Sequence, residues 1–201
     1  MATGISILVV LRPMKKKKVL FIDRDGTLIL ETDDFKIEKF EKLIFFPMVF
    51  QYLGRIAAEL DFELVMVTNQ DGLGTPEFPE PDFWAVQNFI VDVFKNEDIN
   101  FAEVCIDKSY PHEGLATRKP GTGMLTKYFT DDYDLANSFV IGDRITDVML
   151  AKNLGSKCIW MNDGRGLGAT DIKEGIEQLK SYVALESREW KKIYEFLKGL
   201  K

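Results

Sequence analysis

Apolar residues gather in five short runs along the chain, and longer amphipathic stretches separate these runs. The runs are rich in β-branched residues, and their continuous apolarity predicts strands that are buried on both faces. The predicted strands cover 18–23, 62–67, 101–106, 138–142 and 157–161. The stretches between them predict helices near 47–60, 82–96, 121–130 and 145–154.

This alternation of strands and helices is typical of an α/β protein with a doubly wound parallel sheet. Beyond the fifth run, 172–180 is predicted to be helical and 182–185 to add a short strand. Ser187 is placed to cap a last amphipathic helix, whose apolar positions are Trp190, Ile193, Tyr194 and Leu197. Only about twenty residues separate the first strand from the first helix, which is too few for an inserted domain. We therefore expect a flap there at most.

The chain has 201 residues, of which 46% are hydrophobic, and this suits one well-buried domain. We expect a single domain over 15–201, with 1–14 as a flexible tail. Within it, 171–201 is expected to form a C-terminal extension that can link to a further domain. The apolar run 5–11 is too short to span a bilayer and precedes its basic cluster, which is the wrong order for a secretory signal.

Charge and cysteine content narrow the class of protein further. The formal net charge of -6 gives no support for binding nucleic acid or an acidic membrane surface. Cys105 and Cys158 both lie in apolar runs, so we expect buried free thiols, which fit a reducing cytoplasm.

The first strand ends in two carboxylates and a glycine, Asp23-Arg24-Asp25-Gly26. In an open α/β sheet, ligands bind beyond the carboxyl ends of the strands. Asp23 and Asp25 are two residues apart, so an extended backbone places both side chains on one face. Gly26 lets the backbone turn sharply beside a ligand. Taken alone, the same residues also fit a strand followed by an ordinary Asp-Gly turn.

Three further polar signals follow along the chain. Thr68-Asn69 ends the second strand, Arg118-Lys119 precedes the third helix, and Gly142-Asp143 ends the fourth strand, with Asp147 beyond it. Each alone is equally compatible with a cap, a solvated loop or a turn. Because the carboxyl ends of parallel strands share one edge, four such signals together predict one site there.

This ordered set of motifs resembles the haloacid dehalogenase (HAD) superfamily of phosphatases over residues 18 to about 162. The resemblance implies a capless, Rossmann-like sheet in the strand order 3-2-1-4-5, in which Asp23, Asp25 and Asp143 converge. Clustered carboxylates repel a phosphate dianion, so such a site needs a cation. Hard oxygen ligands together with a phosphate favour Mg²⁺.

The resemblance also implies catalytic roles. Asp23 is expected to attack phosphorus and form an aspartyl-phosphate, while Asp25 protonates the leaving alcohol and later deprotonates the attacking water. Thr68, the amides around Asn69, and Lys119 are expected to surround the phosphoryl oxygens.

For the metal, the resemblance implies three ligands and one neighbouring acid. The side chains of Asp23 and Asp143 and the backbone carbonyl of Asp25 are expected to hold it. Asp147 is expected to act as an outer partner or an alternate ligand.

A longer match resembles one family within this superfamily, the histidinol-phosphate phosphatases that form the N-terminal halves of bifunctional histidine-biosynthesis enzymes. It consists of the segments 21–29, 64–75, 78–79 and 140–144, of which 71–75 is the most specific. The resemblance implies hydrolysis of a small molecule, L-histidinol phosphate, to L-histidinol. It also leaves open a fusion to an imidazoleglycerol-phosphate dehydratase domain in the full-length protein.

Two further residues have expected roles in substrate binding. Glu31 matches a family acid that meets the cationic amino-imidazole end of the substrate, and a solvated loop glutamate is the alternative. Arg118 is expected to help bind phosphate through its charge and bidentate geometry.

One departure from the family concerns zinc. Bacterial members carry a zinc loop that opens with Cys-Pro-His and closes with Cys-x-Cys, just before the Arg-Lys-Pro element. Here the opening is Tyr110-Pro111-His112, and Leu115-Ala116-Thr117 occupies the place of the closing cysteines. His112 alone leaves tetrahedral zinc too few ligands, so we expect none.

Two other functions stay open at this point. A capless sugar-phosphate phosphatase, such as the heptose bisphosphate enzyme, shares all four motifs, although the Leu-Gly-Thr and Phe-Pro elements argue against it. A non-catalytic assembly module on a phosphatase-like fold is the second, because fold does not imply function. Intact Asp23, Asp25, Lys119 and Asp143 argue against that module.

Overall fold

The structure, a computed structural model, describes residues 15–172 and 175–200. The predicted tail over 1–14 therefore lies outside the described residues. Six parallel strands form one sheet in the order β3-β2-β1-β4-β5-β6. The strands are β1 (Val19–Ile22), β2 (Glu63–Asn69), β3 (Phe101–Asp107), β4 (Phe139–Gly142), β5 (Lys157–Trp160) and β6 (Val183–Glu186). The predicted order is confirmed, and β6 extends it at one edge.

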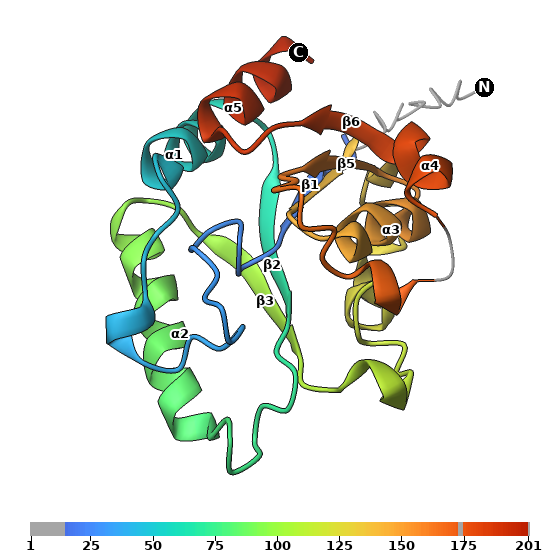
Figure 1. The fold of residues 1–201 in the computed structure, drawn as a ribbon. Coiled ribbons are helices and arrows are strands. Elements are labelled where there is room, and N and C mark those ends of the chain that lie inside the picture. The colour runs from blue at the N-terminus through green and yellow to red at the C-terminus, as the bar shows by residue number, and fades with distance from the viewer. Residues whose placement is uncertain (1–14, 173–174, 201) are drawn as a thin grey trace, which may run out of the picture.

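Helices cover both faces of this sheet (Figure 1). They are α1 (Val49–Glu59), α2 (Glu80–Asn96), α3 (Ile145–Leu154), α4 (Ile176–Leu179) and α5 (Trp190–Gly199). Alternate residues of β1 point into two separate cores, as the period of a strand requires. Leu20 and Ile22 pack in the core beneath α1, α2 and α5, whereas Val19 and Phe21 pack in the core beneath α3 and α4.

The prediction that the strands are buried on both faces is confirmed for the central strands β1 and β4 and is wrong for the edge strand β3. Every residue of β1 and β4 is buried, whereas β3 buries only Cys105 and Asp107. An edge strand has a neighbour on one side only, which explains the difference. Cys105 and Cys158 are buried free thiols, as expected, and burial raises the pKa of Cys105 to about 12.

The predicted helix at 121–130 is wrong, because the segment forms a 3₁₀-helix over Gly123–Tyr128. Leu125 inside it has non-helical angles, with φ -112° and ψ 15°. The backbone at Gly121 lies in close contact with the preceding loop, because a Cβ at Gly121 would be 2.2 Å from the carbonyl oxygen of Ala116. The Gly123 N–H donates to that same carbonyl at 2.8 Å, so the segment forms hydrogen bonds to the loop in place of a regular α-helix.

The C-terminal part packs onto the sheet as a strand and a helix. Within the predicted helix 172–180, the structure describes one helical turn, α4, followed by a 3₁₀ turn over Lys180–Tyr182. The cap predicted at Ser187 is also wrong, since Glu189 is the N-cap of α5 and has no side-chain capping bond. Ser187 Oγ instead accepts from the Glu189 N–H at 3.1 Å.

The segment between β1 and α1 contains only short elements and no inserted domain. It contains a 3₁₀ turn at Phe40–Lys42 and two isolated bridges, Asp25 to Ile29 and Ile29 to Phe45. None of the helices in the described part of the chain has the length and apolarity that a bilayer crossing requires.

Candidate active site

The carboxyl ends of β1 and β4 meet at the centre of the sheet. The two strands are paired, and the Asp23 N–H donates to the carbonyl of Ile141 at 2.8 Å. The backbone of Asp143, which directly follows β4, is held by Trp160, whose Nε1 donates to the Asp143 carbonyl at 3.0 Å. The sheet itself therefore fixes the positions of Asp23 and Asp143.

Three buried carboxylates converge at this point. Asp23, Asp143 and Asp147 each offer an oxygen, and these oxygens all lie within 4.8 Å of one another. Two glycines leave room for them. A Cβ at Gly26 would lie 2.3 Å from Asp143 Oδ2, and a Cβ at Gly142 would lie 2.3 Å from the carboxyl carbon of Asp147. The turn glycine of the first motif is thus required by close packing as well as by its φ of +74°.

Lys119 supplies positive charge to this cluster. Its Nζ donates to Asp23 Oδ1 at 2.6 Å and to Asp147 Oδ1 at 2.8 Å. Burial alone would lower the pKa of Lys119, but the carboxylates of Asp147 and Asp23 outweigh it and raise the pKa. The other oxygen of Asp147 accepts from the Arg144 N–H at 3.0 Å. Lys119 is therefore a permanent cation beside Asp23.

The donor set fits a hard divalent cation. Both oxygens of Asp143 are buried and have no hydrogen-bond partner within the described residues. Burial, followed by the charges of Asp23 and Asp147, raises the pKa of Asp143 to about 9. Buried oxygens are normally satisfied, so this pair points to a ligand from outside the protein. Mg²⁺ takes carboxylate oxygens of this kind.

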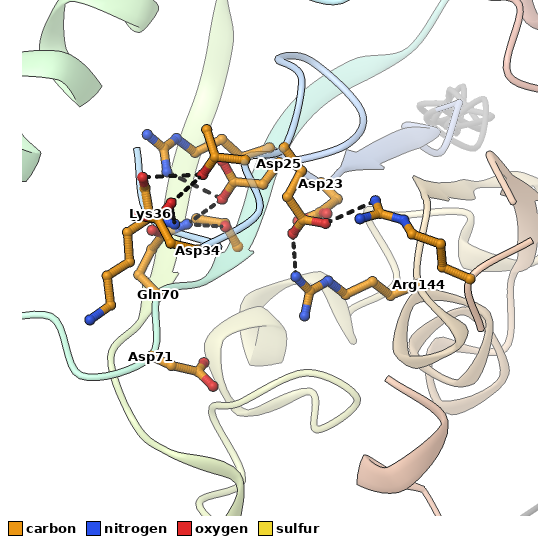
Figure 2. A network of polar contacts seen from close by, with 12 residues as sticks. Asp23, Asp25, Asp34, Lys36, Gln70, Asp71 and Arg144 are labelled. Atoms are coloured by element: carbon orange, nitrogen blue, oxygen red, sulfur yellow. Dashed lines mark hydrogen bonds and ion pairs between the residues drawn. The ribbon is translucent and has the colours of Figure 1, made fainter. Parts of the chain in front are cut away.

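Asp25 lies beside the cluster and has partners of its own. Its Oδ2 accepts from Gln70 Nε2 at 2.6 Å and from Arg24 Nη1 at 3.2 Å. Figure 2 shows Asp25 and Gln70 turned toward each other, with Asp71 standing apart from them. Gln70 also donates to Thr68 Oγ1 at 2.9 Å. Polar contacts therefore join the first and second motifs directly.

Asn69 holds the backbone of the third motif. Its Nδ2 donates to the carbonyl of Lys119 at 3.1 Å, and its Oδ1 accepts from the Lys119 N–H at 3.0 Å. This pair of bonds ties the end of β2 to Lys119. The Asn69 side chain is therefore bound to the protein backbone. Asn69 also lines a cavity together with Asp23 and Lys119.

Glu31 is paired with two arginines. Its Oε1 accepts from Arg144 Nη2, and its Oε2 accepts from Arg165 Nη2 at 3.2 Å. Burial raises the pKa of Glu31, and the charge of Arg144 opposes this effect. The alternative of a solvated loop glutamate is wrong, because the side chain is only 2% exposed. Whether Glu31 binds substrate stays a prediction.

Arg118 is held in a similar way. Its guanidinium contacts both carboxylate oxygens of Asp71, with Nη2 to Oδ2 at 3.2 Å, and Nη1 donates to the Ser109 carbonyl at 2.7 Å. Nη2 also approaches Asp171 Oδ2 at 3.3 Å. Arg118 lines the same cavity as Asp23 and Lys119, so its predicted contact with phosphate stays open.

Hydrogen bonds join the two ends of segment 107–117, which stands in the place of the zinc loop. Asp107 accepts from the Ser109 N–H at 2.9 Å, from the Ser109 hydroxyl, and from the Thr117 hydroxyl at 2.5 Å. His112 stacks on Tyr110, with ring centroids 5.6 Å apart. These contacts connect the two ends of the segment, and the absence of zinc stays a prediction.

A second cavity of about 250 Å³ adjoins the first, and the two share Asp25, Asn69 and Arg144. Carboxylates outnumber cations on its walls, and two exposed aromatic rings line it. The lining residues are Asp25, Glu31, Asp34, Phe35, Lys36, Asn69, Asp71, Tyr110 and Arg144.

Several residues of the site were not predicted from the sequence. Gln70, Arg24 and Arg144 make its main polar contacts. One signal for Gln70 was available: it lies two residues after Thr68, so an extended backbone places both on one face. The partners of the two arginines depend on tertiary structure, and no spacing in the sequence reveals them.

Comparisons with known proteins identify relatives of this chain. A family model described as HAD-hydrolase-like matches residues 116–184. The histidine biosynthesis bifunctional protein HisB of Spirosoma linguale is 50% identical over 186 residues, which cover 90% of this chain and 49% of that protein. The HisB protein of Bacteroides fragilis is 51% identical over 184 residues, which cover 90% of this chain and 48% of that protein. The chain thus spans about half the length of the curated relatives it matches.

Solved structures show the same fold. The D,D-heptose 1,7-bisphosphate phosphatase from B. bronchiseptica, complexed with magnesium and phosphate, superposes with a TM-score of 0.75 at 23% identity. The match covers 92% of this chain and 99% of that one. Over 90% of its length the chain is therefore homologous to about half of the bifunctional histidine-biosynthesis proteins, residues 116–184 match the HAD-hydrolase-like model, and the chain has the fold of that phosphatase.

Proposed function

We propose that this chain is a Mg²⁺-dependent phosphatase that hydrolyses L-histidinol phosphate through an aspartyl-phosphate on Asp23. One observation carries the proposal: Asp23 lies in a buried triad of carboxylates, in contact with Lys119 and beside a cavity lined by carboxylates. The identity of about 50% to bifunctional histidine-biosynthesis proteins supports the substrate.

The side chains of Asp23 and Asp143 and the backbone carbonyl of Asp25 would hold Mg²⁺. Asp147 suits an outer role, because Lys119 and the Arg144 N–H already occupy its two oxygens. Mg²⁺, when bound, offsets the carboxylate charge that would otherwise repel a phosphate dianion.

The chemistry then follows from the positions of the side chains. A carboxylate oxygen of Asp23 attacks phosphorus, and the bond from phosphorus to the leaving oxygen breaks. Asp25 donates its proton to that oxygen and later takes one from the water that cleaves the aspartyl-phosphate. Lys119 and the Thr68 hydroxyl face the same cavity and stabilise the negative charge of the phosphoryl oxygens.

The adjoining cavity supports a cationic leaving group. Four carboxylates and two cations line it, and Arg24, Lys42, Arg118 and Arg165 pair with these carboxylates from outside the lining, so the cavity offers acceptor oxygens without a net negative charge. Phe35 and Tyr110 are 50% and 40% exposed, and such rings attract planar cations. The amino-imidazole end of histidinol phosphate can stack on these rings and donate hydrogen bonds to the carboxylate oxygens, whereas the dianionic second phosphate of a heptose bisphosphate offers them no donor.

Substrate profiling tests the proposal. With Mg²⁺, kcat/KM for histidinol phosphate is expected to exceed the values for heptose bisphosphate and 4-nitrophenyl phosphate by at least about tenfold, since one well-placed charged contact contributes that much. Chelation is expected to abolish turnover, and added Mg²⁺ to restore it. A preference for the heptose would instead identify a sugar-phosphate phosphatase, and no turnover of any substrate would identify a non-catalytic module.

The same homology bears on the whole protein. The relatives are bifunctional, and this chain matches about half of their length. We propose that it provides the phosphatase half, with an imidazoleglycerol-phosphate dehydratase domain as the partner in the full-length protein.

A further inference from the structure

The side chain of Gln70 holds two residues of the site with a single nitrogen. Gln70 directly follows β2 and is 2% exposed. Its Nε2 donates to Asp25 Oδ2 at 2.6 Å and to Thr68 Oγ1 at 2.9 Å. An amide nitrogen has two hydrogens and accepts nothing, so these two bonds use all of its capacity.

The first bond restricts the carboxyl group of Asp25. Its Oδ2 accepts from both Gln70 and Arg24, and a carboxyl oxygen has two lone-pair positions. Oδ1 is buried and has no hydrogen-bond partner among residues 15–172 and 175–200. When Asp25 acts as an acid, its proton therefore belongs on Oδ1.

The second donor to Asp25 is itself fixed. Arg24 is fully buried, and its Nη2 donates to the Ile37 carbonyl at 3.3 Å. Its guanidinium carbon lies 5.1 Å from the centre of the Phe83 ring. Gln70 and Arg24 thus hold Oδ2 from two rigid positions, so Asp25 cannot turn without breaking both bonds.

The second bond from Gln70 sets the direction of the Thr68 hydroxyl. A hydroxyl has one hydrogen to donate. Because Thr68 Oγ1 accepts from Gln70, its hydrogen stays free for another acceptor. Thr68 lines the cavity that also contains Asp23 and Lys119, where a phosphoryl oxygen would accept it.

We propose that Gln70 is a positioning residue that orients the acid Asp25 and the donor Thr68 at the same time. The inference rests on the proposed function, in which Asp25 exchanges the proton. In the first step, the bond from Asp23 oxygen to phosphorus forms, the bond to the leaving oxygen breaks, and the proton moves from Asp25 Oδ1 to that oxygen. In the second step, water oxygen binds phosphorus, one water proton returns to Oδ1, and the bond to Asp23 breaks.

The test uses two phosphate esters that differ in their need for an acid. Histidinol phosphate has a poor alkoxide leaving group, whereas 4-nitrophenyl phosphate has a good one that leaves without a proton. In Gln70→Met, kcat/KM for the alkyl ester is expected to fall about 10- to 100-fold, which is part of the full effect of a general acid. For 4-nitrophenyl phosphate, the aryl ester, the loss of kcat/KM in the same variant is expected to be about tenfold smaller. Thr68→Val should reduce kcat/KM by the same factor for both esters.

Further variants separate this inference from fold damage and from the proposed function. Gln87 is also a buried glutamine, and within the described residues Met66 Sδ is the one hydrogen-bond partner of its Nε2. Gln87→Met is therefore the matched control, and kcat/KM should be unchanged for both esters. Gln70→Glu keeps the size of the side chain and should also lose more kcat/KM for histidinol phosphate than for 4-nitrophenyl phosphate. It replaces Gln70→Met in the test if the methionine variant does not fold.

The outcomes are distinct. If Asp25→Asn loses more kcat/KM for histidinol phosphate than for 4-nitrophenyl phosphate and neither Gln70 variant does, the inference is wrong and the proposed function stands. If Asp23→Asn keeps wild-type turnover, the proposed function is wrong. The same difference between the esters in the Gln70 variants, together with an inactive Asp23→Asn, supports both.

Discussion

Replacing Gly26 with alanine is expected to disable the site at a cost of roughly 1–2 kcal/mol of fold stability. Gly26 has a φ of +74°, and a Cβ there would lie 2.3 Å from Asp143 Oδ2 and 2.5 Å from its carboxyl carbon. The substitution therefore has two separable effects. One is backbone strain, and the other is displacement of a residue that we assign to the metal.

The magnitudes follow from this geometry. A side chain in the left-handed region costs roughly 1–2 kcal/mol of folding free energy. Carbon and oxygen atoms normally stay more than about 3.4 Å apart, so the Asp143 carboxyl must move by roughly 1 Å. Metal ligands tolerate only about 0.2 Å, and a 1 Å misplacement can cost about 100-fold in rate. We expect weaker Mg²⁺ binding and a fall of about 100-fold in kcat/KM.

Gly155 provides a matched control. Its φ is +72°, and a Cβ there would meet nothing within 4 Å. Chemical denaturation should show a loss of about 1–2 kcal/mol for both Gly26→Ala and Gly155→Ala. Titration calorimetry with Mg²⁺ and steady-state turnover should separate them, because only Gly26→Ala disturbs Asp143. Wild-type Mg²⁺ affinity and turnover in Gly26→Ala would refute this reasoning.

Three other predictions concern substrate, zinc and pH. Glu31→Gln is expected to raise KM for histidinol phosphate more than for 4-nitrophenyl phosphate, since only the former has a cationic end; equal changes would make Glu31 a structural residue. Chelator-treated, refolded protein is expected to work with Mg²⁺ alone, and elemental analysis that finds stoichiometric zinc would contradict this. Hydrogen bonds from Tyr194 and Arg55 lower the pKa of Glu59 to about 2, from an ordinary value of 4.5. A lowered carboxyl pKa stabilises the fold above pH 4.5 and less so as the pH falls toward 2. The Tm of Glu59→Gln should therefore lie below wild type at pH 7, and the gap should close in acid; a gap that stays constant would exclude this linkage.

The sequence predicts the sheet well because each strand carries its own local pattern. Continuous apolar runs mark β1 and β4, and polar residues at the carboxyl ends of β1, β2 and β4 mark the edge where the site forms. Four ordered signals suffice here, because parallel strands bring their carboxyl ends together whatever the loops do.

Two of the failures come from contacts with residues outside the pattern that was used for the prediction. The stretch 121–130 has helical spacing, yet the close approach of Gly121 to Ala116 redirects its hydrogen bonds. In the same way, the sequence places Glu31 in a loop but does not reveal that Arg144 and Arg165 enclose it. Local patterns carry no information on such partners.

The central claim is that Asp23 becomes phosphorylated during turnover. Rapid quenching of the enzyme with Mg²⁺ and histidinol phosphate, followed by borohydride reduction, converts an aspartyl-phosphate to homoserine, which peptide mass spectrometry can locate. The account predicts homoserine at position 23 in the wild-type enzyme, at a higher level in Asp25→Asn, because release of the phosphate then lacks its base. Turnover with no reduced aspartate, or with the modification at Asp25, would contradict it.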